Sequence, residues 1–382
     1  MTRIAVSEHV LRWVVDRSGN FEAIEQRFPK LRDWMSGESH PTLRQVEQLS
    51  RVTATPLGYF FLQEPPVERL PIPHFRTLQD SHIDYPSPNL LETVQMMERR
   101  QAWMSEYLIE LGQEPLKFVR SANIATAMEE VASEIRHTLG LVEGWSAQQP
   151  TWSLALRDLQ LRIEEAGILV SVNSVVGNNT HRKLNVDEFR GFVLVDDYAP
   201  LIFVNGADAK AAQMFTLAHE IAHVWFGSSA AFDLRELQPS EDSMELACNR
   251  VAAEVLVPAS EIRNIWPEFE WEVDRFRLVA RQFKVSELVA ARRAQDLDLI
   301  TKSEFISFYN QYQESDRIMA SSQKQGGGNF YFTQNLRLGR RFAETVVRAV
   351  GERKLLYEEA YRLTGLHGKT FDTYASTILP GA

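Results

Sequence analysis

Two histidines and a glutamate stand at a spacing that can build a hydrolytic metal centre: His219-Glu220-x-x-His223, inside an apolar, helix-forming run. On a helix that turns about 100° per residue, the two histidines lie about 40° apart on one face, so both imidazoles can reach one ion. Glu220 stands beside them and can take a proton from water whose pKa a bound ion lowers to about 7. The pattern predicts His219 and His223 as metal ligands and Glu220 as the general base.

A catalytic zinc site of this kind needs a third protein ligand. Glu245 follows His223 by 22 residues on a second predicted helix that begins near Ser240 and ends before Pro258. Asn249 lies four residues further on the same face, where its amide oxygen can accept the free N–H of a liganding imidazole. Glu245 is therefore the expected ligand and Asn249 its support, but other carboxylates on this segment stay open as alternatives: Glu241, Asp242 and Glu254.

The residues before His219 predict the elements that position it. Residues 192–205 indicate two strands around an Asp-Asp turn, and Asp208 is expected to cap a helix that runs from about Ala209 to Phe226. Gly227 is expected to end that helix. His219 would then lie in mid-helix, with no proline or glycine to distort it.

These motifs resemble the ImmA/IrrE family of metallo-endopeptidases. The likeness rests on Phe215-Thr-Leu-Ala-His-Glu-Ile-Ala-His223, on Glu245-x-x-Cys-Asn-x-Val-Ala-Ala-Glu-Val-Leu-Val-Pro258 and on Glu188-Phe-Arg-Gly-Phe192. The wider pattern is that of gluzincins, from which the chain departs because Asn249 stands where aspartate is usual. The resemblance implies a gluzincin-like core, with His219, His223 and Glu245 as ligands, and favours Glu245 over its alternatives.

The same resemblance implies a function. It indicates site-specific cleavage of a protein partner, a DNA-binding repressor, in a stress response or in the induction of a mobile element. The competing hypothesis is a helix-turn-helix transcriptional regulator, or an antitoxin paired with a toxin, whose metal site is not proteolytic. Zn²⁺ is the expected ion, and Mn²⁺ would suit the same ligands.

Composition predicts an intracellular protein. The chain has 382 residues with 44% hydrophobic content, a net charge of −10 and one cysteine, Cys248, which excludes an internal disulfide and suits a reducing compartment. Early charged residues argue against a signal peptide, and no run of about 18 apolar residues predicts a membrane span. We therefore expect a cytoplasmic protein without a membrane partner.

The first 66 residues resemble an XRE-type helix-turn-helix domain. Four short amphipathic segments are separated by Gly19, Gly37 and Pro41. Residues 1–70 contain nine Lys/Arg and nine Asp/Glu, a net charge of zero, whereas phosphate binding requires a basic face. DNA binding through Lys30, Arg32 and Arg44 and a purely protein-binding role therefore both stay open.

The domain organisation follows from these patterns and from the proline-rich stretch Pro65–Pro73. We expect a helix-turn-helix domain at 1–66, a metallopeptidase domain at 67–265 and a helical domain at 266–382, in a mainly helical α+β fold with a short sheet. Two docking surfaces are predicted. One is a sheet edge at residues 189–195 for an extended peptide. The other is an arginine face on a single helix, residues 336–350, with Arg337, Arg341 and Arg348, for which an ordinary solvated helix face stays open as the alternative.

Overall fold

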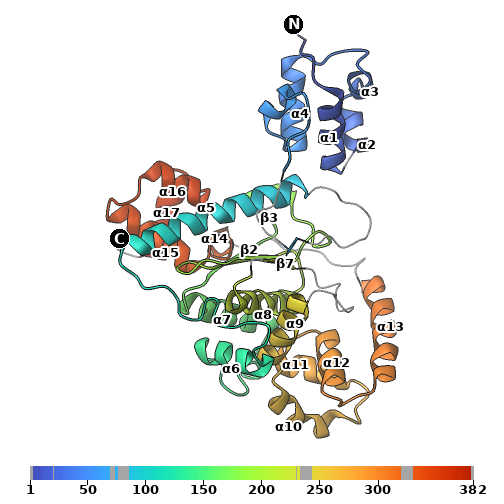
Figure 1. Cartoon of the computed structure of the whole chain (residues 1–382), viewed down its shortest axis with the longest axis vertical. Helices are drawn as coiled ribbons and strands as arrows, with labels where there is room; N and C mark the ends of the chain where they lie inside the picture. The colour runs from blue at the N-terminus through green and yellow to red at the C-terminus, as the bar shows by residue number, and fades with distance from the viewer. Residues whose placement is uncertain are drawn as a thin grey trace.

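A five-stranded mixed sheet lies at the centre of the larger part of the molecule, between two layers of helices (Figure 1). The computed structural model describes residues 3–19, 21–68, 74–75, 86–228, 230–232, 243–319 and 330–379. The strand order is β1-β7-β5-β6-β2, and β3 and β4 form a separate antiparallel pair. The strands are β1 (His74–Phe75), β2 (Leu169–Asn173), β3 (Val175–Val176), β4 (Asn179–Lys183), β5 (Gly191–Leu194), β6 (Leu201–Asn205) and β7 (Ala230–Phe232).

The central strands are apolar on both faces because helices cover both of them. Alternate residues of a strand point to opposite faces, so β6 divides its side chains between two cores. Ile202 and Val204 pack with the helices that include α8, whereas Leu201 and Phe203 pack with α5 and the C-terminal helices. The sheet therefore joins two separate apolar layers.

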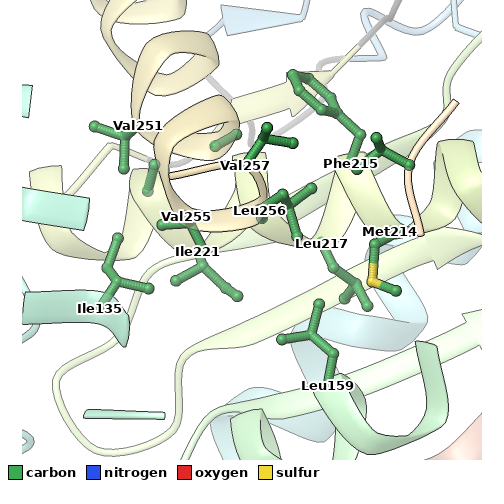
Figure 2. Packing of buried hydrophobic residues seen from close by; sticks show 14 of the residues in the cluster. Ile135, Leu159, Met214, Phe215, Leu217, Ile221, Val251, Val255, Leu256 and Val257 are labelled. Atoms are coloured by element: carbon green, nitrogen blue, oxygen red, sulfur yellow. The ribbon is translucent and has the colours of Figure 1, made fainter. Parts of the chain in front are cut away.

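The layer that carries the histidines contains α6, α7, α8 and α9, with α10–α13 continuing from it (Figure 1). Figure 2 shows apolar side chains of α6, α7, α8 and α9 gathered in the core of this layer, among them Ile135, Leu159, Ile221 and Val255. The bounds are α6 (Met128–Thr138), α7 (Trp152–Glu165), α8 (Lys210–Phe226), α9 (Ser243–Leu256), α10 (Ala259–Phe269), α11 (Arg275–Phe283), α12 (Glu287–Asp296) and α13 (Lys302–Met319).

The opposite face of the sheet is covered by α5 and the C-terminal helices. The buried Arg100 on α5 links them, because its guanidinium donates to the backbone oxygens of Leu363 (2.9 Å) and Arg337 (3.0 Å). Both oxygens lie near the C-terminal end of a helix, where a cation is favoured. The bounds are α5 (Pro88–Glu110), α14 (Phe330–Leu338), α15 (Arg340–Gly351), α16 (Tyr357–Thr364) and α17 (Lys369–Ile378).

The N-terminal residues form a helical unit with its own apolar cluster, which is built around Val10, Leu11, Leu31 and Leu49. A capping box begins α4, with Thr42 and Gln45 each accepting the other's backbone N–H. The four predicted segments are helical, although α3 has only five residues. The bounds are α1 (Glu8–Ser18), α2 (Phe21–Arg27), α3 (Leu31–Met35), α4 (Leu43–Thr53) and the short 3₁₀ helix η1 (Leu57–Phe61).

The mainly helical α+β fold is confirmed, and no described helix has the length and apolar content needed to cross a membrane. The domain limits stay a prediction. Side chains beyond residue 266 divide between two cores, since α11 and α12 pack in the layer with α8 whereas α15–α17 pack with α5. Part of the proline-rich stretch, residues 69–73, lies outside the described residues.

Both predicted docking surfaces need correction. The strand at 189–195 is not a sheet edge, because β5 pairs with β6 on one side and with β7 on the other. The predicted helix at 336–350 is two helices that break at Gly339, where φ is 77°. Arg337 therefore lies on α14 and donates to Asn178 (3.0 Å), whereas Arg341 and Arg348 lie on α15. The three arginines do not share one helix face.

Candidate metal centre

Helix α8 carries three of the predicted site residues and is buried on every side from Gln213 to Trp225. It ends as expected at Gly227, whose φ of 75° allows its N–H to reach the His223 oxygen at 2.8 Å. Its start differs from the prediction. Ala209 is the N-cap, and the carboxylate of Asp208 instead accepts the Ala209 N–H and pairs with Arg190.

His219, His223 and Glu245 converge on one point, with ligand atoms that all lie within 4.8 Å of one another. The two Nε2 atoms are 3.0 Å apart, and the Glu245 oxygens lie 3.2 Å from that of His219 and 3.4 Å from that of His223. In a tetrahedral site with metal–nitrogen bonds of about 2.0–2.1 Å, neighbouring ligand atoms are about 3.3 Å apart. The donor set and its spacing therefore fit a zinc-type ion.

Glu245 reaches this point because α9 packs along α8, and its side chain is 12% exposed whereas both histidines are fully buried. Of its rivals, Glu254 is engaged elsewhere, since it pairs with Arg293 and accepts the Ala259 N–H. Glu241 and Asp242 lie outside the described residues. Within the described part of the chain, no fourth His, Cys, Asp or Glu joins the group.

Asn249 lies where the sequence placed it, with its Oδ1 3.0 Å from Nδ1 of His219. A hydrogen bond there fixes the tautomer, so that the Nε2 lone pair of His219 points at the common point. In the described part of the chain, Nδ1 of His223 is buried without such a partner. Cys248, the neighbour of Asn249, is buried in the apolar cluster of this layer.

Glu220 lies beside the ligands and is completely buried, and neither carboxylate oxygen has a hydrogen-bond partner among the described residues. Burial raises the pKa of Glu220 well above its usual value, and the nearby charge of Glu245 adds to this rise. A buried carboxylate with no partner is costly, so the environment favours its proton-carrying form. Such a group can hold a proton and give it up when a cation lies nearby.

The protonation of the ligands also suits a cation. Burial lowers the pKa of His219 to about 4, so its imidazole is neutral and can donate a lone pair at pH 7. For Glu245, burial alone would raise the pKa, but hydrogen bonds and charge interactions with His219 and His223 outweigh it and leave the pKa lowered. The site therefore offers the neutral imidazole of His219 and the ionised carboxylate of Glu245 beside the buried His223.

Gly191 on β5 is a site residue that the sequence reasoning did not single out. A Cβ at this position would lie 3.3 Å from a Glu220 oxygen and 2.5 Å from Cγ2 of Thr216. The strand backbone thus packs directly against the proposed base. The available signal was a glycine inside a strand pattern, which often marks a close approach.

The predicted DNA-binding residues lie apart from this site, on the N-terminal unit. Lys30 precedes α3, Arg32 lies on α3 and Arg44 on α4, and all three are exposed. Arg32 forms an ion pair with Glu25, so part of its charge is neutralised within the unit.

Comparison with known proteins places the metal centre in a family. Residues 163–295 match the IrrE N-terminal-like domain (Peptidase_M78), and this match contains His219, Glu220, His223 and Glu245. Residues 338–377 match a domain of unknown function, DUF8813. A search of curated proteins gave no match. Residues 163–295 are thus an IrrE N-terminal-like peptidase domain of the M78 type, whose His-x-x-x-His pair and Glu245 form its metal-ligand group.

Proposed function

We propose that the chain is a zinc-dependent, site-specific endopeptidase that cleaves a protein partner in the cytoplasm. The observation that carries this proposal is the meeting of two imidazoles and one carboxylate beside a buried Glu220 that has no hydrogen-bond partner among the described residues. A DNA-binding repressor is the substrate class that the ImmA/IrrE resemblance suggests. Regulation of a stress response or of a mobile element would be the setting.

The metal ligands, Glu220 and Asn249 have different roles in the proposed hydrolysis. When bound to His219, His223 and Glu245, zinc supplies a Lewis acid that polarises a carbonyl and lowers the pKa of water; manganese could serve in the same way. Glu220 accepts the proton of the attacking water and passes it to the leaving amine. Asn249 holds the His219 ring in position throughout, through the 3.0 Å contact to Nδ1.

We assign the N-terminal helical unit to partner binding. Its net charge is zero, Arg32 is paired with Glu25, and α3 has five residues, which leaves a small surface for reading a DNA groove. The alternative is a helix-turn-helix regulator or antitoxin that binds DNA through Lys30, Arg32 and Arg44. Titration of residues 1–66 with mixed-sequence duplex DNA at low salt separates the two roles.

The proposed function is tested by comparing cells that produce the wild-type chain with cells that produce Glu220→Gln at the same level. New protein N-termini are identified by mass spectrometry in both. The proposal expects one or a few cleavage sites, in a DNA-binding protein, that appear only with the wild type. Identical sets of N-termini from the two strains would contradict it.

A further inference from the structure

A cleft of about 400 Å³ opens at the junction of the two matched segments, away from the metal centre. One wall comes from α7, β2 and the start of α8, and the other comes from α14, α15 and α17. Small-molecule sites have volumes of about 300–1,000 Å³ and often lie where domains meet. The position and size of the cleft are those of a ligand site.

Most of the cleft wall is apolar. Edge strand β2 contributes two valines, and the surrounding helices contribute leucine and isoleucine side chains. These residues are Leu156, Leu161, Val170, Val172, Leu336 and Ile378. A ligand that fills the cleft therefore needs an apolar body.

Acidic side chains in the wall are already engaged. Glu344 forms an ion pair with Arg340 at 2.6 Å. Glu164 accepts the backbone N–H of Arg341 at 3.1 Å and so caps the start of α15. Neither carboxylate forms an ion pair with Lys210, which also lines the cleft.

Lys210, the first residue of α8, supplies a positive charge to the cleft. Its Nζ donates one hydrogen bond, to Oε1 of Gln213 at 3.3 Å, and no carboxylate within the described residues forms an ion pair with it. Gln213 is itself held in place, because its amide donates to the backbone oxygens of Gly206 and Asp208. An ammonium group has three donors, so two remain for a ligand.

A second polar group comes from Gln160 on α7. The residue is 7% exposed and lines the cleft. Its amide offers two N–H donors and one acceptor oxygen. It is suited to bind a polar group that enters the cleft.

We propose that this cleft binds a small monocarboxylate with an apolar body, whose carboxylate pairs with Lys210 and hydrogen-bonds to the Gln160 amide. Of the three cations that line the cleft, Arg340 is paired with Glu344 and Arg157 also has a partner, which leaves the Lys210 ammonium to match one negative charge. The apolar wall covers the remainder of the ligand. Because the ligand would contact both walls, it would hold the C-terminal helices against the peptidase domain. The site depends on neither the metal nor peptidase activity.

Calorimetric titration of the full chain with octanoate and with 3-phenylpropionate tests the proposal. We expect saturable binding of at least one of them and at least tenfold weaker binding of the uncharged match, octanol or 3-phenylpropanol. No binding of either acid at millimolar concentration, or equal binding of acid and alcohol, would overturn the proposal.

Two lysine variants show whether the acid occupies this cleft. Lys210→Met keeps most of the apolar stem and removes the charge, so the affinity for the acid should fall about tenfold while the alcohol binds as before. Lys302→Met is the matched control, since Lys302 is an exposed first residue of α13 and does not line the cleft. Unchanged affinity in Lys210→Met, or an equal fall in both variants, would show that Lys210 does not hold the ligand.

Discussion

Replacement of Gly191 by alanine tests whether the sheet backbone fixes the position of Glu220. The added methyl group would lie 2.5 Å from Cγ2 of Thr216 and 2.9 Å from the backbone oxygen of Phe203. Favourable carbon–carbon contacts lie at about 3.5–4.0 Å, so the overlap with Thr216 is about 1 Å. Neither neighbour can easily move away, because Thr216 is β-branched on a helix and Phe203 contributes main chain.

The expected cost follows from these contacts. Overpacking of this kind typically lowers the free energy of unfolding by about 1–3 kcal/mol. Alanine is favoured over glycine in a strand by about 0.5–1 kcal/mol, which offsets part of that loss. We therefore expect Gly191→Ala to lower the free energy of unfolding by about 0.5–2 kcal/mol. The same methyl group would stand 3.3 Å from Glu220, and a shift of about 1 Å in a catalytic group can reduce turnover about 100-fold.

Denaturant unfolding, metal content and cleavage of the partner protein should be measured for Gly191→Ala and for Gly351→Ala. Gly351 is the matched control, because a Cβ there meets no atom within 4 Å. We expect Gly191→Ala to keep its metal and lose stability and turnover, whereas Gly351→Ala keeps all three. Wild-type stability and turnover in Gly191→Ala would refute the close packing of β5 against Glu220.

Three further predictions follow from other contacts. Asn249→Ala should weaken metal affinity or activity about 10- to 100-fold in a folded chain, and Asn249→Asp should restore it; wild-type values in Asn249→Ala would make Asn249 an ordinary helix residue. Burial raises the pKa of Glu164 to about 7, so wild-type stability should fall as pH rises from about 4.5 to 7, by roughly 3 kcal/mol. When unfolding is measured against pH, Glu164→Gln should remove most of that fall in stability, whereas Glu165→Gln should remove none. If the stability of Glu164→Gln fell with pH as steeply as that of the wild type, the raised pKa of Glu164 would be contradicted. Deletion of residues 1–66 should leave the metal bound but slow cleavage of the partner, with casein uncut by either form; undiminished cleavage or rapid casein digestion would oppose docking by this unit.

The metal helix could be predicted from sequence because its determinants are local. The spacing of His219 and His223, the apolar run around them and Gly227 fix one helix and one face, and the structure has that helix. Asn249 was placed by the same reasoning, since four residues separate it from Glu245 on α9. Short-range periodicity is enough to predict a helix and the residues that share one of its faces.

The wrong predictions concern contacts between segments that are distant in the sequence. β5 is interior because β7, from residues 230–232, pairs with it, and no feature near residue 191 encodes that partner. The helix break at Gly339 has a tertiary cause, since a Cβ there would lie 2.4 Å from the backbone oxygen of Val170. The cleft near Lys210 likewise needs two segments that meet only in the folded chain.

Metal content of purified variants tests the central claim most directly. Wild type, Glu220→Gln and Glu245→Gln should be purified alike, dialysed against a weak chelator and analysed for zinc and manganese by mass spectrometry. We expect one equivalent of zinc in the wild type and in Glu220→Gln, and a loss of most of it in Glu245→Gln, because Glu245 is a proposed ligand and Glu220 is not. Equal metal loss in both variants, or full metal in Glu245→Gln, would contradict the assignment of ligand and base.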